Sequence, residues 1–215
     1  YVYLRAKGKD IKHRDEWVYL RDLRRNRRNA FTAKGDNWFG ATYTWDDYSY
    51  RKPWEEEHHI LGRDSFQGRS CYVIESKNLD PGYYLGKRVS WVDPEHFIDL
   101  HEEQYNRQGN LWKIIDRRWE QIAPWEYWAR TQQDYLDILN KTRTVIQNLG
   151  WIFDQGFHDG EFIPGALRRE HIWRLPSKKY PPLNTVADLP PQPQERQEFW
   201  SRLKESGEGR VKAKR

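Results

Sequence analysis

The chain has 215 residues, of which 37% are hydrophobic, and its mean hydropathy is −1.09. Its 12 Trp, 13 Tyr and 8 Phe mean that apolar burial rests on aromatic side chains, and a chain disordered over most of its length is excluded. The net charge of +5 is mild because 32 acidic residues are mixed with 37 basic ones. This mixture disfavours a nucleic-acid binder, which collects its basic charge on one face.

Further classes are excluded by what the sequence lacks. The single cysteine, Cys71, excludes an intramolecular disulfide. No run approaches the roughly 18 apolar residues of a membrane-spanning helix, and no signal-peptide pattern is present. The sequence contains no Met and begins within a strand-like pattern at Tyr1, so we expect the start of the protein to be missing.

The first third of the chain predicts short aromatic strands. Residues 1–4 are a strand-like stub ended by a turn at 7–10, and 17–20 (Trp-Val-Tyr-Leu) has the content of a strand that pairs with it. Five arginines follow in residues 21–28. Residues 45–48 predict a short helical turn that is capped by an aspartate and broken by Pro53.

A meander is predicted from residue 55 onward. Strands are expected over 58–62, 69–76, 87–92, 97–105 and 111–117, separated by turns at 64–68, 80–82, 93–95 and 106–110. Such even spacing with short turns is typical of an antiparallel sheet. We expect one face of the sheet to be apolar, formed by Tyr72, Ile74, Val89 and Trp91, and the other to be charged.

The last third predicts a change of structure. Residues 123–140 suit a helix with Pro124 at its start and an apolar stripe of Tyr127, Ala129, Tyr135, Ile138 and Leu139. Strand character returns over 143–153, and 162–169 indicates a turn into a short helix or a terminal strand. Five prolines in 180–193 predict an extended linker, 195–204 an amphipathic helix, and 207–215 a disordered end. The expected domains are 1–175, a half-barrel lacking its N-terminal part, then the linker 176–194, and a helix with a basic tail over 195–215.

Several of these segments together resemble one known family. They are Glu16-Trp-Val-Tyr-Leu with Leu23, Arg24-Arg25 and Arg27-Arg28; Ile60-Leu-Gly-Arg-Asp; Gly68-Arg-Ser-Cys-Tyr-Val-Ile-Glu-Ser; Gly86-Lys-Arg-Val-Ser-Trp-Val-Asp; Tyr105 with Gly109-Asn-Leu-Trp-Lys; and Phe162-Ile-Pro with Ala166-Leu-Arg-Arg. The pattern, over roughly residues 16–169, resembles the outer-membrane lipoprotein-sorting-like (LolA/LolB-like) periplasmic proteins.

The resemblance implies a mainly β fold with a few helices, namely a curved antiparallel half-barrel covered by helices. It implies a non-enzymatic protein that holds acyl chains, placed in the periplasm or at the outer-membrane periphery of a Gram-negative-type bacterium. Two departures stand out. Only about sixteen residues precede the Trp-Val-Tyr-Leu strand, and a proline-rich tail extends beyond the family's core. Both favour a bound subunit over a freely diffusing carrier.

Two groups of side chains are candidates for lipid contact. Seven aromatic residues either line a lipid cavity or form ordinary core: Trp38, Phe39, Tyr43, Trp45, Tyr72, Trp91 and Trp112. Three arginines, Arg24, Arg25 and Arg28, either hold a lipid head group or a protein partner through bidentate contacts, or are a solvated strand end that protects a sheet edge.

Aromatic residues also indicate contact with protein partners. Trp125 and Trp128 belong to a dense aromatic segment that suits a lid over the cavity or an interface. Phe199 and Trp200, after the prolines, suit an anchor into a partner or a helix packed on the same domain.

No catalytic, metal or cofactor site is predicted. His58 and His59 are adjacent on a strand and point to opposite faces, and with His96 and His101 they show no ligand spacing. A carboxylate group, Asp46, Asp47, Glu55, Glu56 and Glu57, has no nucleophile in a recognisable motif. Cys71 lies in mid-strand, and no phosphate-binding glycine loop occurs.

Three hypotheses follow. The first is a lipid- or lipoprotein-binding envelope protein with no enzymatic activity, whose partner is a lipid or an acylated protein. The alternative is a structural accessory subunit of a larger envelope complex that keeps the fold without lipid transport. The third is a nucleic-acid binder that stacks bases on its sheet, which the abundance of acidic residues disfavours.

Overall fold

The computed structural model describes residues 3–5, 16–20, 23–29, 34–49, 51–161 and 163–168. The chain forms two compact units. One comprises residues 1–34 and 152–180, and the other comprises 35–151 and 181–215.

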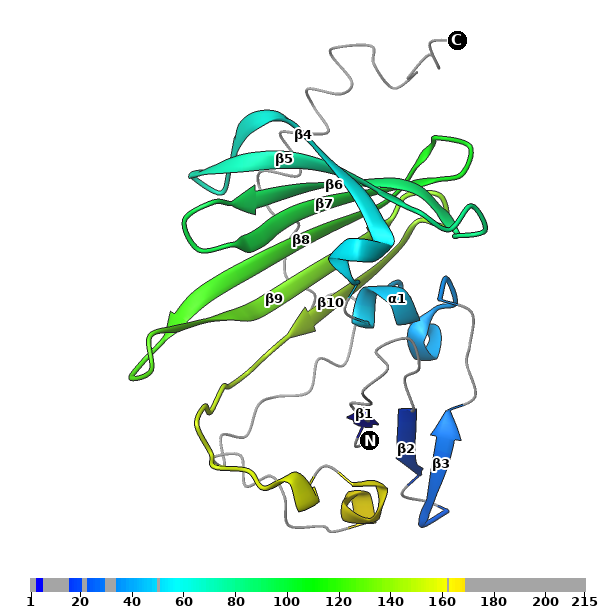
Figure 1. The fold of residues 1–215 in the computed structure, drawn as a ribbon, viewed down its shortest axis with the longest axis vertical. Helices are drawn as coiled ribbons and strands as arrows, with labels where there is room; N and C mark the ends of the chain where they lie inside the picture. The colour runs from blue at the N-terminus through cyan, green and yellow to red at the C-terminus, as the bar shows by residue number, and fades with distance from the viewer. Residues whose placement is uncertain are drawn as a thin grey trace. The chain divides into compact units, whose positions relative to one another are not determined.

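The larger unit contains a seven-stranded antiparallel sheet (Figure 1). Its spatial order is β10-β9-β8-β7-β6-β5-β4, so each strand pairs with its neighbours in sequence and the sheet does not close. The strands are β4 (Glu56–Phe66), β5 (Arg69–Asn78), β6 (Leu85–Asp93), β7 (Ile98–Asn106), β8 (Leu111–Ile122), β9 (Tyr127–Asp137) and β10 (Thr142–Gln147). The prediction of a mainly β, open antiparallel fold with few helices is confirmed.

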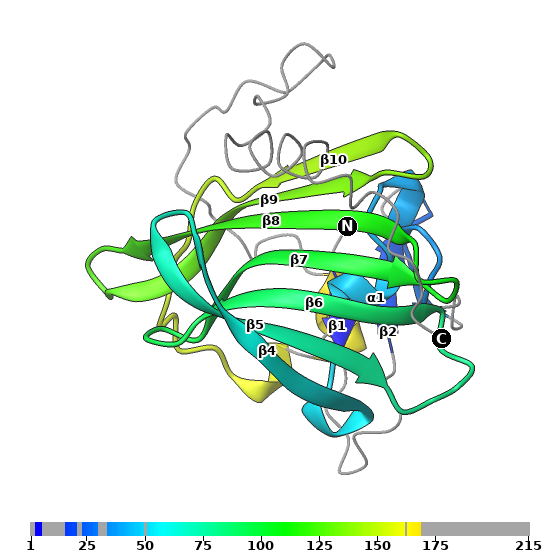
Figure 2. The same ribbon diagram turned by 90° about the horizontal axis from the view of Figure 1, so that it is seen from above.

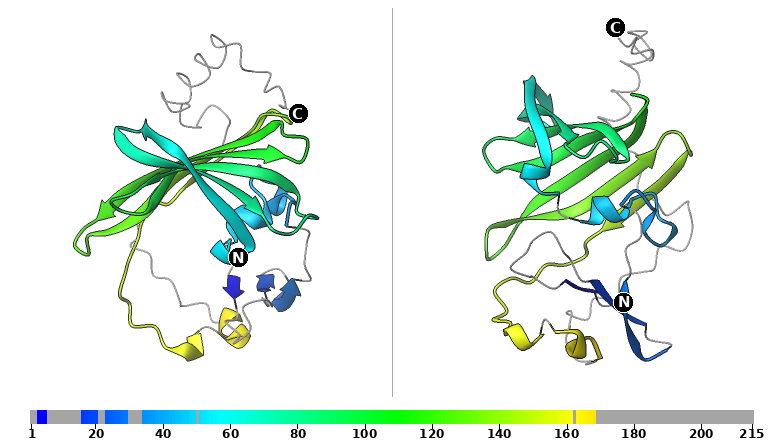
Figure 3. Two further views of the ribbon diagram at one scale, coloured as in Figure 1. Left: turned by 45° about the horizontal axis from the view of Figure 1, so that its top comes forward. Right: turned by 45° about the vertical axis from the view of Figure 1, so that its right-hand side comes forward.

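The sheet is strongly twisted. The strands lie side by side when the sheet is seen from above (Figure 2), and β4 crosses the strands behind it at a steep angle in Figure 3. Bulges accompany the twist, including one in β4 between Ile60 and Gly62 and one between β6 and β7 at Trp91 and Val92.

The predicted helix over 123–140 is wrong. Residues 123–126 form the turn between β8 and β9, and Tyr127–Asp137 is a strand paired on both sides, with Tyr135 opposite both Ile115 and Thr144. Tyr127, Ala129 and Tyr135 are separated by even numbers of residues, so they fit the two-residue period of a strand as well as a loose helical stripe. Pairing with two neighbouring strands decides between the two readings.

The prediction of one apolar face is also wrong. Tyr72 lies opposite Val92, whereas Val73 lies opposite Trp91. Residues that face each other across two strands share a face, and successive residues alternate. Tyr72 and Ile74 are therefore on one face of the sheet and Val89 and Trp91 on the other, and both faces carry polar side chains.

A segment before the sheet covers the face that carries Tyr135 and Ile115. It contains three short helices, η1 (Trp38–Gly40), α1 (Trp45–Tyr48) and η2 (Pro53–Glu55). The predicted helical turn is confirmed, but its cap is Thr44. The Thr44 hydroxyl accepts from the Asp47 amide, and the Asp47 carboxylate accepts from the Thr44 amide in a capping box.

The smaller unit has a three-stranded antiparallel sheet of β1 (Tyr3–Arg5), β2 (Glu16–Leu20) and β3 (Arg25–Asn29). The predicted pairing of the first two strands is confirmed. The unit also holds the 3-10 helices η3 (Asp159–Glu161) and η4 (Pro164–Arg168). The Asn26 side-chain amide donates to the Pro164 carbonyl and joins β3 to η4.

Within the described residues, no helix combines the length and the apolar character needed to cross a membrane. Several predictions lie outside the described residues: the Phe39 side chain, the linker 176–194, and the helix with Phe199 and Trp200.

Candidate functional site

The covered face of the large sheet has a cluster of buried charges at its centre, which we call the ionic network. Its members come from the covering segment (Asp46, Asp47, Arg51), from β7 (Glu102, Gln104) and from β8 (Lys113, Arg117), with Arg88 of β6 and Glu56 of β4 at the side.

Asp47 joins the covering segment to the sheet. Its carboxylate accepts from the Lys113 ammonium at 2.7 Å and from the Gln104 amide at 2.6 Å. It also accepts from Arg51 and from the Thr44 backbone, each at 2.9 Å. The side chains of Asp47 and Lys113 are both fully buried. The capping box at the N-terminus of α1 places Asp47 over β8. The same local structure that caps the helix therefore also positions Asp47 for its buried ion pair with Lys113.

Arg51 bridges three carboxylates. Its Nε lies 2.9 Å from Asp46, one terminal nitrogen 2.9 Å from Asp47, and the other 3.4 Å from Glu102. Glu102 in turn accepts from Arg117 at 3.0 Å and from Gln104 at 2.9 Å. The network is thus charge-compensated, which is the condition for burying charged groups.

The electrostatics keep these groups ionised. Burial alone would raise the pKa of Glu102, but Arg51, Arg117 and Arg88 together hold that pKa far below its usual value of 4.5. Burial likewise opposes ionisation of Asp47, yet Lys113 and Arg51 lower its pKa. Neither carboxylate is therefore suited to hold a proton near neutral pH and act as a general acid.

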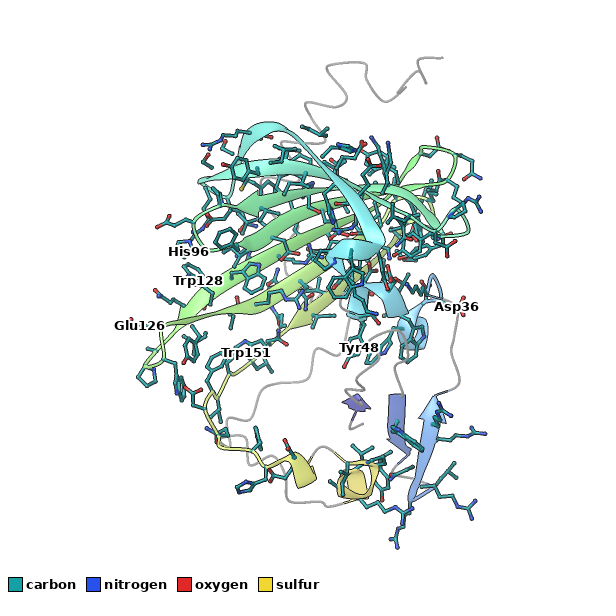
Figure 4. All side chains as sticks on the ribbon, viewed as in Figure 1. Asp36, Tyr48, His96, Glu126, Trp128 and Trp151 are labelled. Carbon is teal, nitrogen blue, oxygen red and sulfur yellow. The ribbon has the colours of Figure 1, made fainter. Side chains whose placement is uncertain are left out.

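An aromatic cluster lies beside the network on the same face. Tyr43 packs on Ile115 and Tyr135, and its ring is 5.2 Å from that of Tyr135. Trp38 extends the cluster outward, stacked on Tyr48 at 5.4 Å and edge-on to Trp45 at 6.1 Å. Trp38 and Trp45 are half-buried, and Tyr48 is 42% exposed. Figure 4 shows Tyr48 on the covering segment.

The structure thus brings together three of the predicted lipid-binding residues, Trp38, Tyr43 and Trp45. Tyr72 lies apart, where its hydroxyl accepts from Arg63 at 2.9 Å. Trp112 packs edge-on against Tyr84 and donates to Asp137 at 2.9 Å.

Trp91 lies on the opposite face in a second cluster. Buried Cys71, Ile98 and Leu100 form its centre, with Phe66, Trp91, Trp119 and Trp128 around them. His101 adjoins this cluster with its ring 4.7 Å from Trp91, and its Nδ1 is 2.5 Å from Asp116. The seven predicted aromatics therefore do not line one common space.

The predicted head-group arginines belong to the smaller unit. Arg24 is in the turn between β2 and β3, Arg25 and Arg28 are on β3, and all three are exposed. Of the predicted partner contacts, Trp125 is half-buried in the β8–β9 turn. Trp128 packs against His96, with ring centroids 4.7 Å apart (Figure 4). The Arg69 guanidinium lies over the Trp128 ring.

One group of described residues has the spacing of metal ligands. Asp93, Glu95 and His96 can each offer an atom, all within 4.8 Å of one another. The Arg69 guanidinium already lies 2.7 Å from the Asp93 carboxylate and 3.3 Å from His96 Nδ1. Arginine thus supplies here the positive charge that a cation would bring.

Sequence reasoning missed the ionic network. The sequence indicates Asp46, Asp47 and Glu56 only as candidate acid–base groups, and nothing in it distinguishes Glu102, Lys113 and Arg117 from other charged residues of the strands. The sequence does show which of these residues share a face of a strand, because side chains two positions apart point the same way. Glu102 and Gln104 are so related on one strand, as are Lys113, Ile115 and Arg117 on the next. That these rows face each other follows only from the register.

Several solved structures are similar to this chain, and two of them have TM-scores above 0.5. A putative outer membrane lipoprotein-sorting protein domain from Vibrio parahaemolyticus is 24% identical with a TM-score of 0.68, covering 78% of this chain and 71% of that chain. A DUF1329 family protein from Desulfovibrio piger is 23% identical with a TM-score of 0.66, covering 77% and 70%. A LolA superfamily protein from Nitrosomonas europaea is 16% identical with a TM-score of 0.46, covering 69% and 66%.

The predicted resemblance to lipoprotein-sorting-like proteins is confirmed by the first two of these structures at the level of the fold. No curated protein matches the chain. A family model described as "Uncharacterized protein" matches residues 2–169, and the chain belongs to this family.

Proposed function

We propose that this chain is a non-enzymatic, lipid- or lipoprotein-binding protein of the cell envelope, which holds an acyl chain against the aromatic cluster of Trp38, Tyr43, Trp45 and Tyr48. The observation that carries the proposal is this cluster, which lies on the covered face of the sheet and keeps Tyr48 42% exposed. The fold likeness to a putative lipoprotein-sorting domain supports it.

The chemistry of the face limits where an acyl chain can lie. Each buried methylene contributes about 0.8 kcal/mol, so a chain of ordinary length binds well wherever rings or aliphatic groups surround it. Hydrocarbon placed over the ionic network would remove water from charged groups without replacing their hydrogen bonds. The ligand is therefore assigned to the aromatic cluster and to its neighbours Ala41 and Ile146.

Native mass spectrometry of the gently purified protein, followed by organic extraction and lipid analysis, tests this proposal. The wild type is expected to carry a stoichiometric acyl lipid. Trp38→Ala removes the ring that joins Tyr43, Trp45 and Tyr48, and it should lower retention at least tenfold. The matched control is Trp91→Ala, another half-buried tryptophan on the opposite face, which should retain the lipid. Equal retention by all three proteins would contradict the assigned position.

A second candidate is a structural accessory subunit of an envelope assembly. The observation that favours it is the ionic network, because salt bridges and their hydrogen bonds fill the centre of the face that an open lipid container would leave apolar. A bare mass that stays bare after incubation with mixed envelope lipids would support this candidate over the first.

A further inference from the structure

The hairpin of β2 and β3 in the smaller unit presents a concentrated positive charge. Residues 21–28 contain five arginines and one acidic residue, Asp22, which leaves a net charge of +4 in eight positions. Arg24, Arg25 and Arg27 are all exposed. Within the part of the chain that the structure describes, no carboxylate forms an ion pair with any of these three.

The backbone gives these arginines a common side. In β3 the Asn26 side chain is half-buried and donates to the Pro164 carbonyl, so the Asn26 face of the strand is turned toward η4. Side chains alternate along a strand. Arg25 and Arg27 are therefore on the other face, away from η4, and Arg24 sits at the turn with a φ of 46°.

An apolar residue, Leu23, lies in the same turn between β2 and β3 as Arg24. Leu23 is next to Arg24 in the turn and is 62% exposed. We call Leu23, Arg24, Arg25 and Arg27 the basic tip. A single large apolar side chain bordered by arginines matches the interface of a bilayer, where phosphates meet the first methylenes.

We propose that the basic tip docks on the surface of an anionic lipid bilayer. The arginines contact lipid phosphates, for which the planar guanidinium suits bidentate hydrogen bonding, and Leu23 enters the boundary between head groups and acyl chains. This inference is independent of what the aromatic cluster binds, because it concerns a different unit of the chain. A nucleic acid or an acidic protein would use the arginines but would give Leu23 no apolar surroundings.

Vesicle co-sedimentation tests the proposal. The probes are vesicles of phosphatidylcholine alone and vesicles with 30 mol% phosphatidylglycerol, each at low and high salt. The wild type should bind only the anionic vesicles, and the binding should weaken with salt because exposed charges are screened. Each arginine near an anionic surface is worth about a fivefold change in partitioning. The triple variant Arg24→Gln, Arg25→Gln, Arg27→Gln should therefore bind about a hundredfold more weakly.

A charge-matched control separates the basic tip from the net charge of the protein. Arg107→Gln, Arg118→Gln, Lys141→Gln removes three exposed cations of the larger unit and should stay within a few-fold of the wild type. An equal loss in this control would overturn the proposal, as would a wild type that ignores anionic vesicles.

Leu23→Ser separates a bilayer from a soluble polyanion. This variant should bind anionic vesicles several-fold more weakly while its retention on a heparin column is unchanged. If Leu23→Ser binds vesicles like the wild type while the triple variant loses vesicles and heparin alike, the basic tip is a general polyanion surface and the bilayer assignment is wrong. Native mass spectrometry of bound lipid reads out the aromatic cluster separately, so failure of either proposal is recognised by itself.

Discussion

Lys113 is a lysine whose side chain is fully buried, and its ammonium lies 2.7 Å from the equally buried Asp47 carboxylate. Removing one partner of such a pair leaves an uncompensated charge away from water, which is more harmful than removing both. The residual contacts of Asp47 with Arg51 and Gln104 soften the effect without replacing the lost charge.

We therefore expect Lys113→Met to lower the free energy of unfolding by about 3 kcal/mol. Urea denaturation followed by tryptophan fluorescence measures it. The control is Lys77→Met, because Lys77 is half exposed and pairs with Glu75 at 3.0 Å, and such pairs contribute at most about 1 kcal/mol. Similar losses of unfolding free energy in the two variants would show that burial of the Asp47–Lys113 pair does not increase its contribution to stability.

His101 gives a pH-dependent stability. Burial lowers its pKa, but hydrogen bonds to Asp116 and Glu103 outweigh burial and raise the pKa from 6.5 to about 9. A pKa raised by folding means that the protonated ring stabilises the folded state below pH 6.5, and that this stabilisation is lost as the pH rises toward 9.

The free energy of unfolding of the wild type should therefore fall by up to about 1.4 kcal/mol per pH unit between pH 7 and 9. His101→Gln should show a shallower dependence in this window. His59→Gln, at an exposed position on β4, should keep the wild-type slope. Denaturation curves at several pH values give the three slopes. A wild-type slope in His101→Gln would show that His101 does not cause the pH dependence of stability.

One position of strand β6, Gly86, has no room for a larger residue than glycine. A Cβ at Gly86 would come within 2.4 Å of the Asn106 carbonyl oxygen and 3.2 Å of the Arg107 Cα. These are backbone atoms, which cannot rotate away as a side chain does. The irregular pairing of β6 with β7 at Leu85 and Lys87 includes this position.

Gly86→Ala should accordingly lower the free energy of unfolding by about 2 kcal/mol, within the range for overpacked sites. Gly150→Ala adds the same methyl group where no atom lies within 4 Å, and it should change stability by less than about 0.5 kcal/mol. Thermal melts of both variants test the difference, and a neutral Gly86→Ala would mean that the end of β7 at Asn106 and Arg107 moves away without cost.

The strands were largely predictable because each one ends at a turn signal that the sequence displays. Asp80-Pro81-Gly82 falls between β5 and β6, while Asp93-Pro94-Glu95 and 106–110 begin at the last residues of β6 and β7. The segment 123–140 contains strand β9 instead of the expected helix. Tyr127, Ala129 and Tyr135 fit the period of a strand as well as that of a helix. The pairing of β9 with β8 and β10 decides between them, and no local sequence pattern contains this pairing.

The candidate site was less predictable, for a reason that lies in the register. Trp38, Tyr43 and Trp45 are close in sequence, and their rings also lie together in the structure. Trp91 was placed with Tyr72 because both lie on alternating strands, but the face of each strand depends on which residues pair across the sheet, and a shift of one residue reverses it. The pair of Asp47 and Lys113 spans 66 residues, a separation that one sequence cannot reveal.

The two units of the chain differ in where their charged side chains lie. The larger unit encloses ion pairs and hydrogen bonds between its covering segment and its sheet, with aromatic clusters on both faces. The smaller unit carries its exposed arginines on a three-stranded hairpin sheet. Native mass spectrometry of bound lipid therefore tests the larger unit, and vesicle co-sedimentation tests the smaller one.

The ionic network also affects how the protein responds to temperature. Exposing apolar surface raises the heat capacity of unfolding, whereas exposing polar surface lowers it. Because the larger unit buries Glu102, Lys113, Arg117 and their partners, its heat capacity change should fall below the usual value of about 12 cal/mol/K per residue. Differential scanning calorimetry at several pH values measures this quantity. A small value gives a broad, flat stability curve, so the fold keeps nearly constant stability from the cold to physiological temperature.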